Sequence, residues 1–152
     1  MDYPDTSFLY ALYRSQVNSE QALQYRVQHP EPLCVTRLLL WEFRQSARFQ
    51  SFRHQQDRSV GFSLQKANQM LEAVRDDLNA GVLLVLECDL ERVLAVGEKI
   101  SKQKTSENGH RGFDILHVAT ALELKADAFL SFDANQNDLA ASEGLRVPLG
   151  KC

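Results

Sequence analysis

Hydrophobic and polar positions change their spacing along the chain in a way that predicts alternating strands and helices. The segments with strand character are short and comprise 3–5, 33–35, 82–86, 128–132 and 146–147. The segments with helical spacing comprise 7–16, 18–29, 37–52, 63–80, 90–100, 112–125 and 134–142. Such alternation is typical of α/β proteins, so we expect a three-layer α/β/α sandwich with a central parallel sheet.

Individual residues sharpen this prediction at several element boundaries. The run 82–86 is apolar throughout, which suits a strand that is covered by helices on both faces. Thr36 and Asp89 are expected to cap the helices that follow them. Pro4 is unusual in a strand because it cannot donate a backbone hydrogen bond. The polar stretch 101–110 predicts a loop or a frayed helix end.

Length and composition favour a single soluble domain that spans residues 1–152. The chain is 44% hydrophobic and 24% charged, which is ordinary for a globular protein. It contains no apolar run of the ~20 residues that a membrane-spanning helix needs, and its first residues lack a basic region. Cys34, Cys88 and Cys152 have unrelated spacings, which favours reduced thiols and a cytoplasmic location.

Four acidic residues lie next to the predicted strands. Asp5 and Asp133 each end a strand, Asp114 lies in the first turn of the helix before a strand, and Glu42 lies in the helix after one. Because ligands of open α/β sheets gather beyond the carboxyl ends of the strands, we expect these side chains to meet at one edge. Each aspartate also has a simpler interpretation, as a helix cap or as a partner of the helix macrodipole.

Glu42 is harder to explain, because it lies within the apolar run Leu38-Leu39-Leu40-Trp41-Glu42-Phe43. It could pair with Arg14, Arg44 or Arg111, or it could face a metal ion. An unpaired buried carboxylate is costly, and clustered carboxylates repel one another unless cations keep them ionised. An all-oxygen site suits a hard divalent cation such as Mg²⁺.

Four segments of the sequence resemble a known protein family. "DTSFLYAL" (5–12), "LLLWEFRQS" (38–46), "RGFDILHVATALELKADAFLSFD" (111–133) and "ANQNDLAASEGLRV" (134–147) are similar to the PIN-domain family. The resemblance is greatest to the VapC-type toxin ribonucleases, and it runs in the right order over nearly the whole chain. It implies one PIN-like domain that cleaves RNA with Mg²⁺ or Mn²⁺ as cofactor.

The resemblance also assigns residues. The acids that match those of the family, as metal ligands and catalytic residues, are Asp5, Glu42, Asp114 and Asp133. Ser7 matches the family's hydroxyl residue after the first acid, and Ser131 matches the hydroxyl residue two positions before the last one. Asp5 and Asp114 are expected to touch the metal directly, and the other two acids directly or through water. One ion and two ions are both compatible with this set.

Partners follow from the same resemblance. We expect an RNA substrate, a homodimer and, for the toxin branch, a small antitoxin protein as the partner in a type II pair. The sequence departs from the family at Pro4, which precedes the first acid, and at Asn135, where many relatives carry a basic residue. Neither departure removes a catalytic acid.

The net charge of −3 argues against nucleic-acid binding only while the four candidate acids are included in the sum. Without the four candidate acids the formal charge changes from −3 to +1, and RNA binding needs local rather than total positive charge. The candidate phosphate contacts are Arg14, Arg44, Arg48, Arg53, His54, Lys102, Lys104, His110 and Arg111.

Other interpretations of these residues stay open. An inactive nuclease fold could hold RNA or a protein partner without cutting. His117, one turn after Asp114, could act as a general acid or base, although a packed histidine is the more common case. Trp41 and Phe43 could stack on a base, although core packing is the more common role of such side chains.

Overall fold

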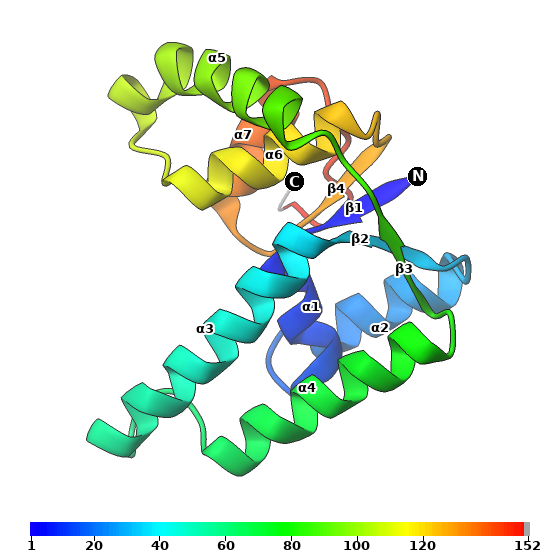
Figure 1. Cartoon of the computed structure of the whole chain (residues 1–152), viewed down its shortest axis with the longest axis vertical. Coiled ribbons are helices and arrows are strands. Elements are labelled where there is room, and N and C mark those ends of the chain that lie inside the picture. Colours follow the sequence, from blue (N-terminus) through cyan, green and yellow to red (C-terminus); the bar gives the residue numbers. More distant parts are fainter. Residues whose placement is uncertain (151–152) are drawn as a thin grey trace. The chain divides into compact units, whose positions relative to one another are not determined.

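The computed structural model describes residues 1–150 as four strands and seven helices (Figure 1). The strands are β1 (Asp2–Pro4), β2 (Leu33–Thr36), β3 (Leu83–Leu86) and β4 (Ala128–Leu130). The helices are α1 (Thr6–Tyr13), α2 (Ser19–Gln28), α3 (Arg37–Gln56), α4 (Leu64–Asn79), α5 (Leu90–Asn108), α6 (Gly112–Glu123) and α7 (Ala134–Ser142). The predicted alternation of strands and helices is confirmed. Within residues 1–150, every helix is too short or too polar to span a membrane.

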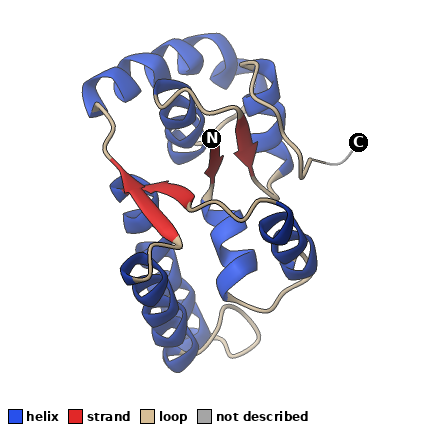
Figure 2. Ribbon diagram, turned by 90° about the vertical axis from the view of Figure 1, so that its right-hand side faces the viewer, coloured by secondary structure: helices blue, strands red, loops and turns tan. Residues whose placement is uncertain are grey.

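The strands form two separate pairs, which are red in Figure 2. Strands β1 and β4 run parallel, with Tyr3 opposite Phe129, and β2 pairs with β3. Residue contacts divide the chain into two compact units, one formed by residues 1–8 and the chain from Leu86 onward, and the other by residues 9–85. The predicted fold class, α/β with parallel strands, is confirmed. The assignment of residues 1–152 to a single domain stays a prediction.

Pro4 fits into β1 because of the alternation of its backbone. The N–H of Asp5, the next residue, donates to the Leu130 carbonyl of β4 over 2.9 Å. Successive residues of a strand direct their N–H groups to opposite sides, so the Pro4 nitrogen faces away from β4. A proline at the end of this strand therefore removes no hydrogen bond of the β1–β4 pair.

The first unit has an aromatic core around β1 and β4. Tyr3 stacks on Phe129 with ring centroids 6.2 Å apart, and Phe8 stacks on Phe132 at 6.0 Å. Helix α6 packs against α5 and α7, and α7 packs against β4 (Figure 1). This packing fixes the carboxyl ends of β1 and β4, from which three of the predicted site residues extend.

In the second unit, tyrosines of α1 connect this helix to α3 and α4 through ring packing and hydrogen bonds. The Tyr10 ring lies 5.1 Å from that of Phe43 in α3, and its hydroxyl donates to Ser46 Oγ over 3.0 Å. The Tyr13 hydroxyl donates to Asp77 of α4 over 2.7 Å. Burial and the adjacent Asp77 carboxylate together raise the pKa of Tyr13 far above its usual value, so Tyr13 stays a neutral donor.

Two predicted elements differ from the structure. The stretch from Ser101 to Asn108 continues α5 as helix, whereas we expected a loop or a frayed end. Its two lysines, its glutamine and its glutamate are good helix formers. Gly109 ends the helix in the left-handed conformation with φ of 68°. The predicted strand at 146–147 is only an isolated bridge between Arg146 and Ala128.

Two of the three cysteines lie within the described residues. Cys34 and Cys88 are both free thiols that are partly buried. Cys152 lies outside the described residues.

Candidate active site

Asp5 occupies the junction of β1 and α1 and is fully buried, with 0% of its surface exposed. Its Oδ1 accepts hydrogen bonds from Ser7 Oγ over 2.7 Å and from the Phe8 backbone N–H over 2.9 Å. Its Oδ2 accepts from Ser131 Oγ over 2.6 Å. The bond from Phe8 N–H makes Asp5 the cap of α1, so the capping role foreseen for this residue is real and coexists with the site.

Two serines tie the ends of β1 and β4 together around this carboxylate. Ser131 Oγ, besides donating to Asp5, accepts from the Asp133 N–H over 2.9 Å. Ser7 Oγ likewise accepts from the Phe132 N–H over 2.8 Å. The two hydroxyl oxygens lie 3.3 Å apart. Residues 5, 7, 131 and 133, which are far apart in sequence, therefore form one hydrogen-bonded cluster.

Asp133 is exposed at the start of α7. The prediction that it caps this helix is confirmed. Its Oδ1 accepts from the Gln136 N–H over 3.2 Å, which makes it the cap of that helix. A carboxylate has about four lone-pair positions, so capping leaves acceptor capacity for another ligand. The backbone of Asp133 is fixed through Ser131, and the carbonyl of Ser131 accepts from Asn137 Nδ2 over 3.1 Å.

The contribution of Asn137 was missed from the sequence. A signal existed in Asn135-Gln136-Asn137, three consecutive polar residues that begin two positions after Asp133. Gln136 and Asn137 are only 7% and 6% exposed, and buried amides usually serve a hydrogen-bonding purpose.

Asp114 lies in the first turn of α6, where its Oδ2 accepts from the Arg111 N–H over 3.4 Å. One turn later on the same face, His117 Nδ1 lies 3.3 Å from the hydroxyl of Tyr3, which precedes Asp5 by two residues. This contact turns the Asp114–His117 face of α6 toward β1. His117 is 1% exposed and hydrogen-bonded, which agrees with the packed role.

Burial governs the electrostatics of Asp5. Loss of water raises the pKa of this carboxyl above its ordinary value, against the opposing effect of hydrogen bonds from Ser131, Ser7 and Phe8 and of the nearby His117. A carboxylate that is costly to ionise gains from a cation that approaches it.

Glu42 belongs to the second unit, where it lies on α3 and is partly rather than fully buried. Its charge helps to raise the pKa of Tyr10, for which burial is the main cause. The expectation that both of its neighbours are buried is wrong for Trp41, which is 53% exposed, and right for Phe43, which is 0% exposed. An α-helix turns successive side chains by about 100°, so a helix with one face in solvent places some residues of an apolar run at the surface. The convergence of Glu42 with the aspartates stays a prediction.

The sequence matches the model of the PIN domain over residues 3–142. The chain belongs to the PIN domain family. No curated protein sequence matches it.

Solved structures agree with this PIN fold. VapC20 of Mycobacterium tuberculosis, described as a Sarcin-Ricin loop cleaving toxin, has a TM-score of 0.61 at 14% identity, over 95% of this chain and 96% of that one. VapBC-1 of nontypeable Haemophilus influenzae has a TM-score of 0.62 at 15% identity, over 97% and 96%. FitAcB of Neisseria gonorrhoeae has 0.59 at 17%, over 97% and 96%. At these identities the similarity shows the fold.

PIN domains are in general metal-dependent, and the donor chemistry of this cluster suits a hard cation. Asp5, Ser7, Ser131 and Asp133 offer only oxygen atoms, and the carboxylate of Asp5 is destabilised by burial. Within residues 1–150, no three His, Cys, Asp or Glu side chains lie close enough to hold a metal as they stand. Mg²⁺ commonly uses one or two carboxylates and completes its shell with water and substrate phosphate, so the Asp5 cluster fits it.

The hydrogen-bonded cluster around Asp5 leads to a first testable prediction, which concerns Ser131. Ser131→Ala leaves the Asp133 N–H and one oxygen of Asp5 without their partner, and each loss of a buried hydrogen bond costs about 1–3 kcal/mol. We expect the melting temperature to fall by several degrees, at about 2–4 °C per kcal/mol for a chain of this size, as measured by thermal unfolding.

Ser51 provides a matched control, because it is 2% exposed and its hydroxyl has no hydrogen-bond partner within residues 1–150. Ser51→Ala should leave the melting temperature unchanged or raise it slightly. Equal destabilisation by the two variants would contradict the role of Ser131 in this cluster.

Proposed function

We propose that this chain is a divalent-metal-dependent endoribonuclease that hydrolyses phosphodiester bonds of RNA. The observation that carries the proposal is the Asp5 carboxylate, which is fully buried at the end of β1 and held by two serines and a backbone N–H. A buried acid held in this way, in a chain of the PIN family, is suited to fix a cation at one position.

The four acids and the two serines have different roles in the proposed metal site. Asp5 and Asp114 would hold Mg²⁺ or Mn²⁺ directly, and Glu42 and Asp133 would do so directly or through water. When bound, the cation lowers the pKa of a nearby water and offsets negative charge on the phosphate. Ser7 and Ser131 would keep the Asp5 carboxylate in one orientation, because both hydroxyls donate to it. Ser7 also accepts from Phe132 N–H, which limits its own rotation.

The exposed face of α3 supports a nucleic acid as the substrate. Trp41 is 53% exposed, and Arg44 and Arg48 are exposed on the same helix, three and seven residues later. Aromatic faces stack on unpaired bases, and arginines neutralise phosphates. This combination favours a single-stranded nucleic acid.

For the partners we propose a homodimer and, in the role of a type II toxin, a small antitoxin protein. The support is the similarity in fold to VapC20 and VapBC-1, whose descriptions name a toxin in the first case and a two-component assembly in the second. A cytoplasmic location accords with the free thiols of Cys34 and Cys88.

The direct test is incubation of the purified chain with end-labelled single-stranded RNA in Mn²⁺, in Mg²⁺ and in EDTA. We expect discrete cleavage products with either metal and none with EDTA. Binding of the RNA in a gel-shift assay without cleavage in any metal would instead establish the inactive binding module.

A further inference from the structure

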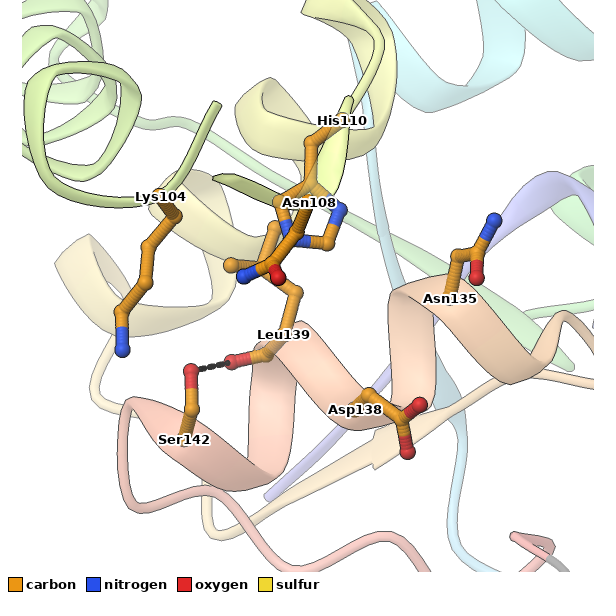
Figure 3. Close-up of a pocket in the computed structure, with 7 residues that line it drawn as sticks. All are labelled: Lys104, Asn108, His110, Asn135, Asp138, Leu139 and Ser142. Atoms are coloured by element: carbon orange, nitrogen blue, oxygen red, sulfur yellow. Dashed lines mark hydrogen bonds between the residues drawn. The ribbon is translucent and has the colours of Figure 1, made fainter. Parts of the chain in front are cut away.

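The first unit contains a polar pocket that the proposed catalytic residues do not use. It has a volume of about 250 Å³ and lies between the carboxyl end of α5 with the following turn and the outer face of α7. Figure 3 shows Lys104, Asn108 and His110 on the α5 side, and Asn135, Asp138 and Ser142 along α7. We call it the α5–α7 pocket.

The lining of the α5–α7 pocket combines donors and acceptors rather than charges of one sign. Lys104 offers an ammonium group, Asp138 a carboxylate, and Asn108 and Asn135 offer both functions of an amide. Ser142 Oγ donates to the Leu139 carbonyl over 2.8 Å, which leaves its oxygen as an acceptor. A ligand that fits must itself carry several donors and acceptors.

His110 gives a second indication that a ligand belongs here. Its Nδ1 is buried and makes no hydrogen bond within residues 1–150. Buried polar atoms in folded proteins almost always have a partner, and this atom belongs to a side chain that lines the pocket (Figure 3). Because this nitrogen is covered in the structure, a ligand would partner it only after the His110 ring turns toward the pocket.

Size and chemistry together favour a nucleobase. About 250 Å³ is below the roughly 300–1,000 Å³ of pockets for drug-sized ligands, so the pocket suits a group of smaller size. A simple anion would suit Lys104 but would be repelled by Asp138. The edges of nucleobases, by contrast, present donors and acceptors side by side, and Asn, Lys and Asp side chains match them.

The position of the pocket relates it to the catalytic cluster. Asn135 follows Asp133 by two residues at the start of α7, a rise of about 3 Å along the helix axis, and Asp133 N–H is bonded to Ser131 in that cluster. The pocket and the cluster thus share the start of α7, although side chains two positions apart on a helix face different sides.

We infer that the α5–α7 pocket binds the base of a nucleotide next to the cleaved phosphodiester and so sets the sequence preference of cleavage. The inference rests on the proposed ribonuclease function. Lys104 and His110, two of the nine candidate phosphate contacts in the sequence, then contact a base instead of serving only as surface charges.

A binding experiment tests the pocket without depending on catalysis. The ring proton signals of His110 in the full chain are followed by NMR in EDTA, with AMP, GMP, CMP, UMP or inorganic phosphate added, and are assigned with His110→Gln. We expect a saturable shift with at least one of the nucleotides and none with phosphate. Asp138→Asn and Asn108→Ala should weaken the binding by about tenfold, whereas Lys99→Ala, an exposed lysine of α5 outside the pocket, should not.

A cleavage experiment then separates this inference from the proposed function. RNA with randomised positions around the cut is digested by the unaltered chain, by Asp138→Asn, by Lys104→Ala and by Lys99→Ala. We expect the first two variants to change the preferred bases and Lys99→Ala to keep them. Cleavage with unchanged preference in all variants, or His110 signals that respond to no nucleotide or equally to phosphate, would overturn the pocket and leave the ribonuclease intact. Absence of any cleavage with a normal His110 response would overturn the ribonuclease and the role of the pocket in cleavage preference, and would leave base binding by the pocket intact.

Discussion

Asp5→Asn is expected to reduce metal-dependent RNA cleavage by about 100-fold or more. A catalytic cation is worth several kcal/mol of transition-state stabilisation, and every ~1.4 kcal/mol corresponds to a factor of ten in rate. The substitution removes the charge of the buried carboxylate while it keeps an oxygen that can accept from Ser7 and from Phe8 N–H. The measurement is the initial rate of cleavage of labelled single-stranded RNA in Mn²⁺.

Asp89→Asn is the matched control for this experiment. Asp89 caps α5, with its Oδ1 accepting from the N–H groups of Glu91 over 3.0 Å and Arg92 over 3.3 Å. Asn is as good a cap as Asp, so both variants should stay folded, and only Asp5→Asn should lose activity. Equal activity of the two variants would remove Asp5 from the proposed mechanism.

The second large effect is expected in thermal stability on addition of metal. Binding to the folded state alone contributes about 2.7 kcal/mol when the metal concentration is 100 times the dissociation constant. For a chain of this size we expect millimolar Mg²⁺ or Mn²⁺ to raise the melting temperature by about 5–10 °C relative to EDTA. Differential scanning calorimetry of the unaltered chain provides the comparison.

The site variants give this stability experiment its specificity. Asp5→Asn and Glu42→Gln should each shrink the metal effect, and Glu42→Gln should also raise the melting temperature in EDTA, because it removes repulsion among the acids. If Glu42 serves only in a structural ion pair, Glu42→Gln would destabilise the chain and the metal effect would persist. Asp89→Asn should keep the full metal effect.

Local chemistry explains how much of the fold could be predicted from the sequence. Thr36 caps α3 through the Leu39 N–H over 3.3 Å, and Asp89 caps α5, as their side chains predicted. The helix from Leu64 to Asn79 follows the apolar spacing of its sequence. The end of α5 is helical against the prediction, because polar residues such as those at 101–108 form helices well and the stop signal lies only at Gly109.

The candidate site was predictable in composition but not in geometry. The positions of Asp5 and Asp133 at strand ends indicated that they could meet. The bond from Ser131 to Asp5, by contrast, spans 126 residues and depends on the register of β1 against β4. No local pattern carries that information. The α5–α7 pocket likewise joins side chains from segments about thirty residues apart, which spacing alone does not bring together.

The exposure of Trp41 shows that composition alone also fails to predict which apolar residues are buried. Hydrophobicity of the run from Leu38 to Phe43 predicted burial, but α3 directs Phe43 into the core of its unit and Trp41 to the surface. The phase of a helix relative to its neighbours, rather than its composition, decides which apolar residues are buried.

The proposed mechanism requires that the carboxylates of this chain hold a divalent cation at the carboxyl end of β1. Crystals soaked in MnCl₂ locate this cation through the anomalous scattering of manganese. We expect a peak beside an oxygen of Asp5, with Asp114 and the remaining two acids around it directly or through water. A manganese peak elsewhere, or no peak beside Asp5 at saturating metal, would contradict this mechanism.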